Sequence, residues 1–363
     1  MIRLPACMAS AGLLVIATLM AVPALAIEPP SVGFVHIRST PCLLAKNGQG
    51  PKCEPPALPE NASTQELVAA HSSRAQFFID IGELQTSLGE ADEALNLDPA
   101  NAGIRHLVAR LAMSTGDYVR AEREIKTAIA QRPDDVSLRV TNAVRLKSRS
   151  WLEQALHEFD DILAKWPDHR FSREERATLL LSLGRPDEAV TDLNILLAGD
   201  RRDANLFAFR ATARLAMNDP QPAIDDFTEA LKQSPGRFDL LTGRAMAYEV
   251  SGDDLAALRD YEAILGPIDG QPNIIMKGDQ LAKYRTQRVL VLVRLKRFAD
   301  AAADMMNAIN VGGRRAILRA QVYLRQNGFP ETPLDGQDSS GLRAALKSCF
   351  GLNSCFEKIS DTF

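Results

Sequence analysis

The sequence is poor in aromatic residues and in cysteine, and charges of one sign never form a long run. Only 6% of its 363 residues are aromatic, although 46% are hydrophobic. A core with so few aromatic rings rests mainly on alanine and leucine, which favours closely packed helices. The formal net charge is −4, with no basic cluster. This small net charge indicates neither nucleic acid nor acidic lipid as the partner.

Motifs of the common catalytic and nucleotide-binding sites are also missing. The sequence contains no G-x-S-x-G, Walker loop, H-E-x-x-H or dinucleotide fingerprint. Adjacent acids such as Asp160 and Asp161 point to different sides of a helix, so they are typical of a solvated surface. The histidines occur singly, without the i, i+4 spacing of a metal site, at His36, His71, His106, His157 and His169. We therefore expect no enzyme activity, no metal and no cofactor.

One apolar run stands apart, at the N-terminus. Arg3 precedes an uncharged apolar segment, Ala11 to Val22, and Ala24-Leu25-Ala26 follows it. This order is typical of a secretory signal peptide, residues 1–26, with cleavage after Ala26. An uncleaved membrane anchor is the alternative, but the run is shorter than the ~20 residues that span a bilayer. We expect a periplasmic or secreted protein whose mature chain has no stable membrane span.

Cysteine usage fits an oxidising compartment. Cys7 lies in the signal peptide, and the other four form two local pairs, Cys42 with Cys53 and Cys349 with Cys355. Four cysteines allow three connectivities, of which the local one closes the smallest loops. Zinc is disfavoured because neither spacing is C-x-x-C and no histidine lies close in sequence to either pair. The first pair falls in a proline-rich arm, residues 27–62, which cannot be a long helix.

A sequence repeat with a fixed period organises the rest of the chain. In the unit 204–237, apolar residues at helical spacing predict a first helix, Ala204 to Met217, and a second helix after Asn218-Asp219-Pro220. Shifts by whole periods of 34 residues place Ala223 on Ala189, Ala155, Ala121 and Ala257. Small residues where two helices touch, and proline after the second helix, recur at the same offsets. The units begin near residues 102, 136, 170, 204 and 238, after a degenerate first unit opened by the capping box Ser63 to Glu66.

This pattern resembles the tetratricopeptide repeat family over residues 63–313. The resemblance implies an all-α fold, a right-handed α-α superhelix of about seven helix-turn-helix repeats. An insertion at 266–278 shifts the period, and a C-terminal cap with a closing helix occupies 314–363. We number the positions of each repeat from the first residue of its unit. The sequence departs from the family at position 4, where the usual aromatic residue is replaced by Arg105, Arg139 and Arg173.

Arginine recurs at position 7 and aspartate at position 23 of four units. Because the hairpin turns at position 15, these two positions face each other across it. A basic stripe for an anionic ligand is the functional alternative, but the paired recurrence favours a structural ladder of ion pairs. The predicted pairs are Arg176–Asp192, Arg210–Asp226, Arg244–Asp260 and Arg288–Asp304.

The family resemblance also implies a concave groove along the first helices, suited to a protein or peptide. We expect an exported interaction scaffold, with a glycan- or small-ligand-binding module and an unrecognised hydrolase as alternatives. An enclosed pocket of aromatic residues would favour the glycan module, with Trp151, Trp166, Phe171 and Tyr284 as candidates. A histidine bonded to a carboxylate in a cleft would favour the hydrolase. The predicted groove residues are His106, Arg110, Val144, Lys147, Thr178, Leu181, Thr212, Leu215, Met246, Glu249 and Leu290.

Overall fold

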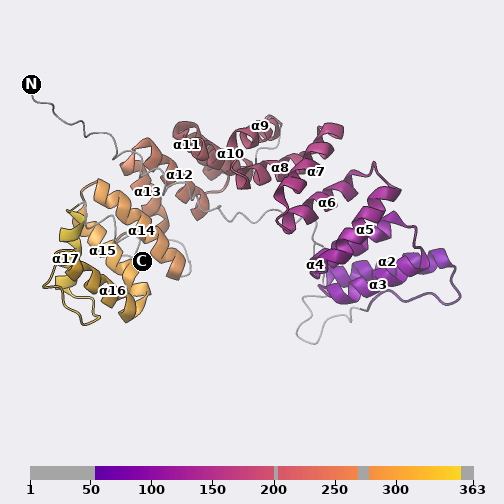
Figure 1. Cartoon of the computed structure of the whole chain (residues 1–363), viewed down its shortest axis with the longest axis horizontal. Helices are drawn as coiled ribbons and strands as arrows, with labels where there is room; N and C mark the ends of the chain where they lie inside the picture. Colours follow the sequence, from indigo (N-terminus) through magenta and orange to yellow (C-terminus); the bar gives the residue numbers. More distant parts are fainter. Residues whose placement is uncertain (1–53, 200–202, 269–277, 353–363) are drawn as a thin grey trace, which may run out of the picture. The chain divides into compact units, whose positions relative to one another are not determined.

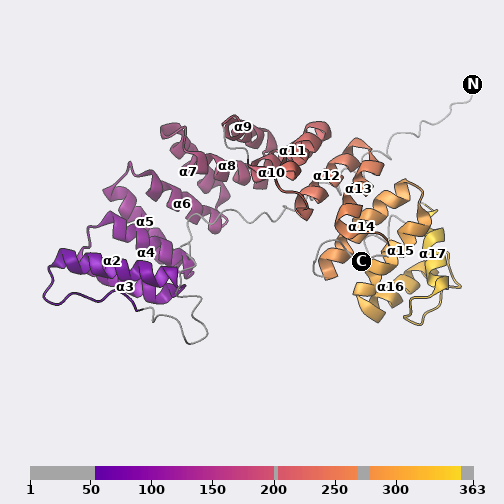
Figure 2. The ribbon, with the colours of Figure 1, turned by 180° about the vertical axis from the view of Figure 1, so that it is seen from behind.

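The computed structural model describes residues 54–199, 203–268 and 278–352. These residues form sixteen helices and no strand, which confirms the all-α prediction. They divide into two compact units, with the boundary between Asp192 and Leu193. Within each unit the helices follow one another as antiparallel hairpins (Figures 1 and 2).

The N-terminal unit contains three complete hairpins and most of a fourth. In each hairpin the first helix packs on the second, and each second helix packs on the first helix that follows it. The helices are α2 (Thr64–Asp80), α3 (Leu84–Leu97), α4 (Ala102–Ser114), α5 (Tyr118–Gln131), α6 (Val136–Ser148), α7 (Leu152–Lys165), α8 (Arg170–Ser182) and α9 (Pro186–Leu197), the last of which crosses the boundary.

The C-terminal unit continues this arrangement through three more hairpins and then changes it. Helix α17 packs on both α15 and α16 and closes the unit (Figure 1). The helices are α10 (Ala204–Ala216), α11 (Pro220–Gln233), α12 (Phe238–Ser251), α13 (Asp254–Leu265), α14 (Gly278–Arg294), α15 (Phe298–Val311), α16 (Gly313–Gln326) and α17 (Ser340–Phe350).

The repeat register read from the sequence agrees with the helix boundaries. The predicted starts at residues 102, 136, 170, 204 and 238 are the first residues of α4, α6, α8, α10 and α12. Ser63 forms the predicted capping box, in which its backbone nitrogen donates to Glu66 Oε2 over 2.8 Å. Asp219 precedes α11 as expected, but its side chain makes no capping hydrogen bond. Helix α14 starts at Gly278, so the last residue of the insertion expected at 266–278 belongs to this helix.

Position 15 turns the chain from the first helix to the second in all seven hairpins. Its backbone is left-handed in each, with φ between 57° and 87°. Four hairpins use glycine there, for which this conformation has no steric cost. The other three use Ser150, Asn218 and Lys296, of which asparagine tolerates the left-handed region best.

Small side chains let the two helices of a hairpin approach closely. The alanines at position 8, from Ala75 to Ala245, and those at position 20, from Ala121 to Ala257, are fully buried. Ser87 replaces alanine at position 20 of the first hairpin and is buried as well. Its hydroxyl donates to the Ala75 carbonyl over 2.8 Å, which removes the cost of burying a polar group.

A buried glutamine holds the loop between α16 and α17 in place. Gln321 Nε2 donates to Asp335 Oδ1 over 2.8 Å, and Gln321 Oε1 accepts from the Gly336 backbone over 2.9 Å. Leu342, Leu346 and Phe350 of α17 then join the apolar core that extends from α12 to α16. The predicted C-terminal cap is therefore a helix-loop-helix element with its own polar anchor.

The proline-rich arm is described only at its end, where the Pro56 carbonyl accepts from Arg74 Nη1 over 2.9 Å. Cys349 is buried at the end of α17. Cys42, Cys53 and Cys355 lie outside the described residues, as do the predicted signal peptide and residues 269–277 of the expected insertion. Both disulfides therefore stay predictions. Among the described helices, none has the length and apolar character needed to cross a bilayer.

Candidate functional site

The structure brings together all four arginine–aspartate pairs expected at positions 7 and 23. In each pair two guanidinium nitrogens donate to the two carboxylate oxygens. The shortest contact is 2.7 Å in Arg176–Asp192, Arg210–Asp226 and Arg244–Asp260, and 2.6 Å in Arg288–Asp304. Such bidentate, charge-assisted hydrogen bonds are strong and directional. Because they occupy both carboxylate oxygens inside the repeat, these arginines do not form a free basic stripe.

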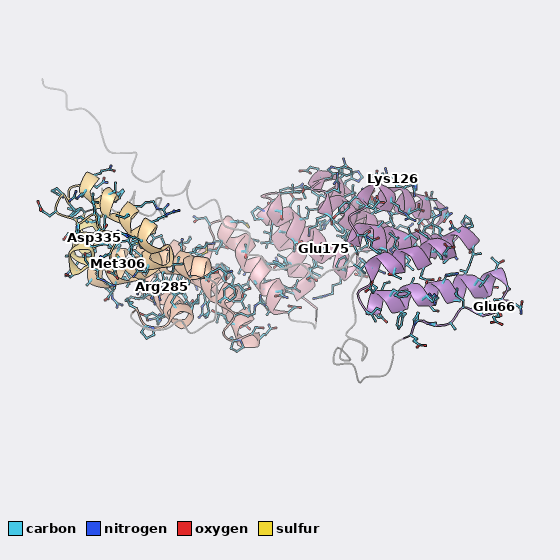
Figure 3. All side chains as sticks on the ribbon, turned by 90° about the horizontal axis from the view of Figure 1, so that it is seen from below. Glu66, Lys126, Glu175, Arg285, Met306 and Asp335 are labelled. Atoms are coloured by element: carbon cyan, nitrogen blue, oxygen red, sulfur yellow. The ribbon has the colours of Figure 1, made fainter. Side chains whose placement is uncertain are left out.

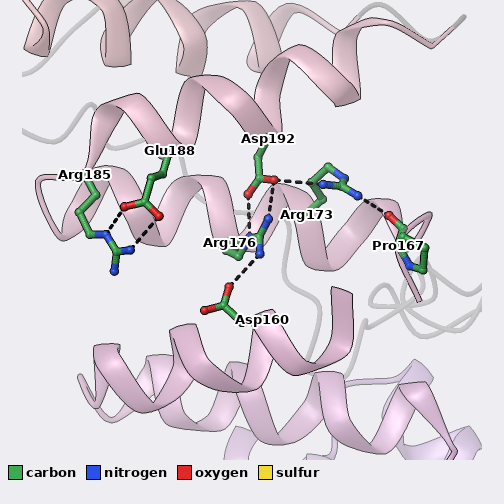
Figure 4. Close-up of polar contacts among 7 residues, drawn as sticks. All are labelled: Asp160, Pro167, Arg173, Arg176, Arg185, Glu188 and Asp192. Carbon is green, nitrogen blue, oxygen red and sulfur yellow. Dashed lines mark hydrogen bonds and ion pairs between the residues drawn. The ribbon is translucent and has the colours of Figure 1, made fainter. Parts of the chain in front are cut away.

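The same ladder extends into the hairpins that lack arginine at position 7. There the arginine at position 4 contacts the acid at position 23, as in Arg105–Glu124 and Arg139–Glu158, the latter over 3.0 Å. In the fourth hairpin both positions are filled, and Arg173 and Arg176 share Asp192 (Figure 4). The constant offset between positions 4 and 23 was visible in the sequence, but its meaning was missed.

We call the half-buried strip at positions 5, 9 and 12 of the first helices the first-helix face. Its part in the N-terminal unit is crossed by polar contacts between consecutive first helices. His106 Nε2 lies 2.7 Å from Thr141 Oγ1, which joins α4 to α6. Lys147 Nζ donates to Glu175 Oε2 over 2.9 Å and to Thr178 Oγ1 over 3.0 Å, which joins α6 to α8.

Burial shapes the electrostatics of this strip. Desolvation, reinforced by the nearby charge of Arg110, lowers the pKa of His106 to about 4, so this imidazole is neutral at pH 7. Burial also lowers the pKa of Arg110, although its guanidinium remains charged at neutral pH. Val144 is buried, whereas Thr178 and Leu181 are half-buried.

In the C-terminal unit the first-helix face has a second polar crossing. Arg294 Nη2 donates to Glu249 Oε2 over 2.6 Å, and Tyr261 donates its hydroxyl to Glu249 Oε1 over 2.8 Å. Burial raises the pKa of Glu249 above its usual range, against the opposing effect of Arg294. The other predicted residues of this part are half-buried, and three of the four are apolar: Thr212, Leu215, Met246 and Leu290.

Neither alternative function finds the arrangement it requires in the described residues. His71 Nδ1 does lie 2.8 Å from Glu90 Oε2, but Arg74 binds the same carboxylate, so this pair belongs to the ladder. Trp151 and Trp166 cap opposite ends of α7, and Tyr284 packs edge-on against Phe238 in the other unit. In the described ranges, no cluster of three or more histidine, cysteine or acidic side chains is placed to hold a metal.

A group of arginines and aromatic rings lies where the second and third hairpins turn, and sequence reasoning missed it. The Arg149 guanidinium lies 5.4 Å from the Tyr118 ring and 5.6 Å from the Trp151 ring. Arg145 lies 5.7 Å from the same Trp151 ring and is only 2% exposed. The spacing alone does not predict the contact of Arg149 with Tyr118, because it joins residues from two repeats.

Comparison with known protein families identifies a single family. The sequence matches the tetratricopeptide repeat family over residues 74–139, 145–205 and 210–272, together more than half of the chain. Among curated protein sequences, no match is found.

Several solved structures are similar to this chain at low sequence identity. A tetratricopeptide repeat protein from Parabacteroides merdae superposes with a TM-score of 0.51 at 18% identity, covering 68% of this chain and 94% of that one. PilF from Pseudomonas aeruginosa has a TM-score of 0.47 at 15% identity, covering 55% of this chain and 90% of its own. MamA from Desulfovibrio magneticus RS-1 has a TM-score of 0.43 at 16% identity, covering 44% of this chain and 90% of its own.

Proposed function

Because the chain belongs to the tetratricopeptide repeat family, we propose that it is an exported scaffold that binds a protein or peptide on its first-helix face. A tetratricopeptide repeat fold indicates a protein-interaction scaffold in general. The N-terminal sequence supports the periplasm or the extracellular space as its location.

One observation carries the choice of surface. The charged groups that cross the first-helix face are already paired within the chain, as in Lys147–Glu175 and Arg294–Glu249. Leu181 in the N-terminal unit stays partly exposed, and so do Leu215 and Met246 in the C-terminal unit. A ligand would gain mainly by covering these apolar side chains, at about 25 cal/mol per Å² of apolar surface. An extended or helical peptide with spaced apolar residues fits such a strip.

The test is a capture experiment with the mature chain as bait in an envelope extract. The double variant Leu215→Glu/Met246→Glu places two charges on the first-helix face. Its matched control, Ile195→Glu/Leu255→Glu, makes the same change at exposed positions on second helices. We expect a discrete partner that the wild type and the control retain and the face variant loses, with circular dichroism showing that all three are folded.

Two outcomes would contradict the proposal. Equal capture by all three proteins would move the binding site away from the first-helix face. Complete loss in the control alone would assign binding to the second helices.

A further inference from the structure

Arg285 is a buried cation at position 4 of the seventh hairpin. It lies on α14 and is only 7% exposed (Figure 3). Its Nε atom is inaccessible to solvent and has no hydrogen-bond acceptor among the residues that the structure describes. A buried donor without an acceptor destabilises the fold, and more so when the group is charged.

The neighbouring carboxylate is fully used by another arginine. Asp304 is completely buried and accepts from Arg288 Nε over 2.6 Å and from Arg288 Nη2 over 2.8 Å. Arg288 also donates Nη1 to the Gly266 carbonyl over 2.7 Å. Both oxygens of Asp304 are therefore taken by Arg288, and no ion pair of Arg285 forms within the described part of the chain. Burial accordingly lowers the pKa of Arg285, with Asp304 and Arg288 acting on it in opposite directions.

Other hairpins show how this position is normally satisfied. Arg105 and Arg173, also at position 4, each contact the acid at position 23 and a proline carbonyl at the end of the preceding repeat. Where two arginines share Asp192 in the fourth hairpin, Asp160 supplies a second carboxylate at 2.8 Å from Arg176. The seventh hairpin has two arginines at the same positions, and among residues 54–199, 203–268 and 278–352 no second carboxylate contacts them.

We propose that Arg285 binds a small oxyanion, a carboxylate or a phosphate, which supplies the missing negative charge. The guanidinium fork matches the geometry of both groups. A buried charge without a partner is unfavourable, so an anion that contacts the Arg285 guanidinium is stabilised on binding by relieving this penalty. Position 4 faces the second helix of its own hairpin. The proposal therefore stands apart from peptide binding at positions 5, 9 and 12.

The experiment measures thermal unfolding of the mature chain in sodium phosphate, sodium acetate or sodium chloride at one ionic strength. A ligand that binds only the native state raises the midpoint as the logarithm of its concentration above Kd. Relative to chloride, we expect the midpoint to rise with the logarithm of the phosphate concentration, the acetate concentration or both. A response to phosphate alone, or to acetate alone, identifies which oxyanion the site takes.

Arg285→Met should remove this rise, whereas Arg259→Met, at an exposed arginine on α13, should keep it. In chloride, Arg285→Met should unfold at the same temperature as the wild type or higher, because it removes an unpaired buried charge. Arg288→Met should lower the midpoint strongly, because it leaves Asp304 buried without its partner.

A second readout needs no variant to be stable. Titration of phosphate or acetate into the wild type should shift the side-chain Nε–H resonance of Arg285 in ¹H–¹⁵N spectra. The proposal is wrong if neither anion shifts that resonance, or if wild type and Arg285→Met respond equally to the anions. A lower midpoint of Arg285→Met in chloride would also overturn it, since Arg285 would then stabilise the fold without a ligand.

Discussion

The role of a single residue in this protein depends on the side chains that the neighbouring repeat places next to it. His106 illustrates this, because its repeat position predicted a groove residue and its environment makes it a neutral link between two repeats. Its imidazole lies 2.7 Å from Thr141, in the hairpin that follows. A charged imidazole would lose solvation there without gaining a carboxylate, which is why its pKa falls.

This shift predicts a pH-dependent stability of the N-terminal unit. The pKa of His106 is about 4 in the folded state against 6.5 in the unfolded chain, so the unfolded state binds the proton more tightly. Stability contributed by this group is therefore complete above pH 6.5 and declines as the pH falls towards 4. The whole decline amounts to about 3 kcal/mol. Urea unfolding followed by tryptophan fluorescence measures it, because both tryptophans lie in this unit.

His106→Gln provides the control, since glutamine does not titrate. Glu249 has a raised pKa and would contribute the opposite slope, with stability lost as the pH rises, but it lies in the other unit and is present in both proteins. Parallel pH profiles for wild type and His106→Gln would refute the assignment.

At the scale of helices, the hairpins depend on close approach of small residues. Gly243 on α12 shows the limit of this packing, because a Cβ atom at that position would lie 2.4 Å from Cζ of the buried Phe227 on α11. Gly89 on α3 is the opposite case, with no atom within 4 Å of a Cβ atom placed there. Both glycines lie inside helices and have ordinary helical backbones.

The two glycines should respond to alanine with opposite signs. Gly243→Ala forces the Phe227 ring to move, and overpacking of this kind costs about 1–3 kcal/mol. The gain in helix propensity, about 1 kcal/mol, offsets only part of that cost. Gly89→Ala receives this gain without a clash and should stabilise its hairpin. Hydrogen exchange of α3 and α12, read by mass spectrometry, should slow in Gly89→Ala and accelerate in Gly243→Ala. Slower exchange of α12 in Gly243→Ala would contradict the packing argument.

At the scale of the whole molecule, the described chain consists of two units that repeat one design. Each unit places an acid at position 23 opposite an arginine at position 4 or 7, for instance Glu124 with Arg105 and Asp260 with Arg244. These pairs are mostly buried, and breaking one by removing a single partner costs about 3–5 kcal/mol. The ladder thus specifies which helices pair, in addition to the unspecific apolar contacts of alanine and leucine.

The predicted export concerns the whole chain and is testable directly. Expression of the full sequence in a Gram-negative host should give a periplasmic protein whose first residue is Ile27, as read by intact mass. Ala26→Phe should block processing, because the residue before the cleavage point must be small. Leu25→Phe, one residue earlier, should be processed normally. Retention of residues 1–26 on the exported wild type would show that this segment is an anchor.

The sequence by itself determined the hairpin register, the helix starts and the pairing of positions 7 and 23. Each of these features recurs in at least four repeats, so each one is seen several times in the same chain. Asp192 with Arg176 is predictable because the two residues face each other across one turn. A local turn of known geometry is enough to bring them together.

Only the tertiary structure decided the contacts between repeats and the environment of each charge. The positions of Arg173 and Arg285 are equivalent, yet Arg173 reaches Asp192 and Arg285 reaches no acceptor with its Nε. The bond from His106 to Thr141 and the contact of Arg149 with Tyr118 likewise join separate repeats. Burial and the use of an acceptor by a competing donor depend on all neighbours at once. The period of the sequence carries no information about that competition.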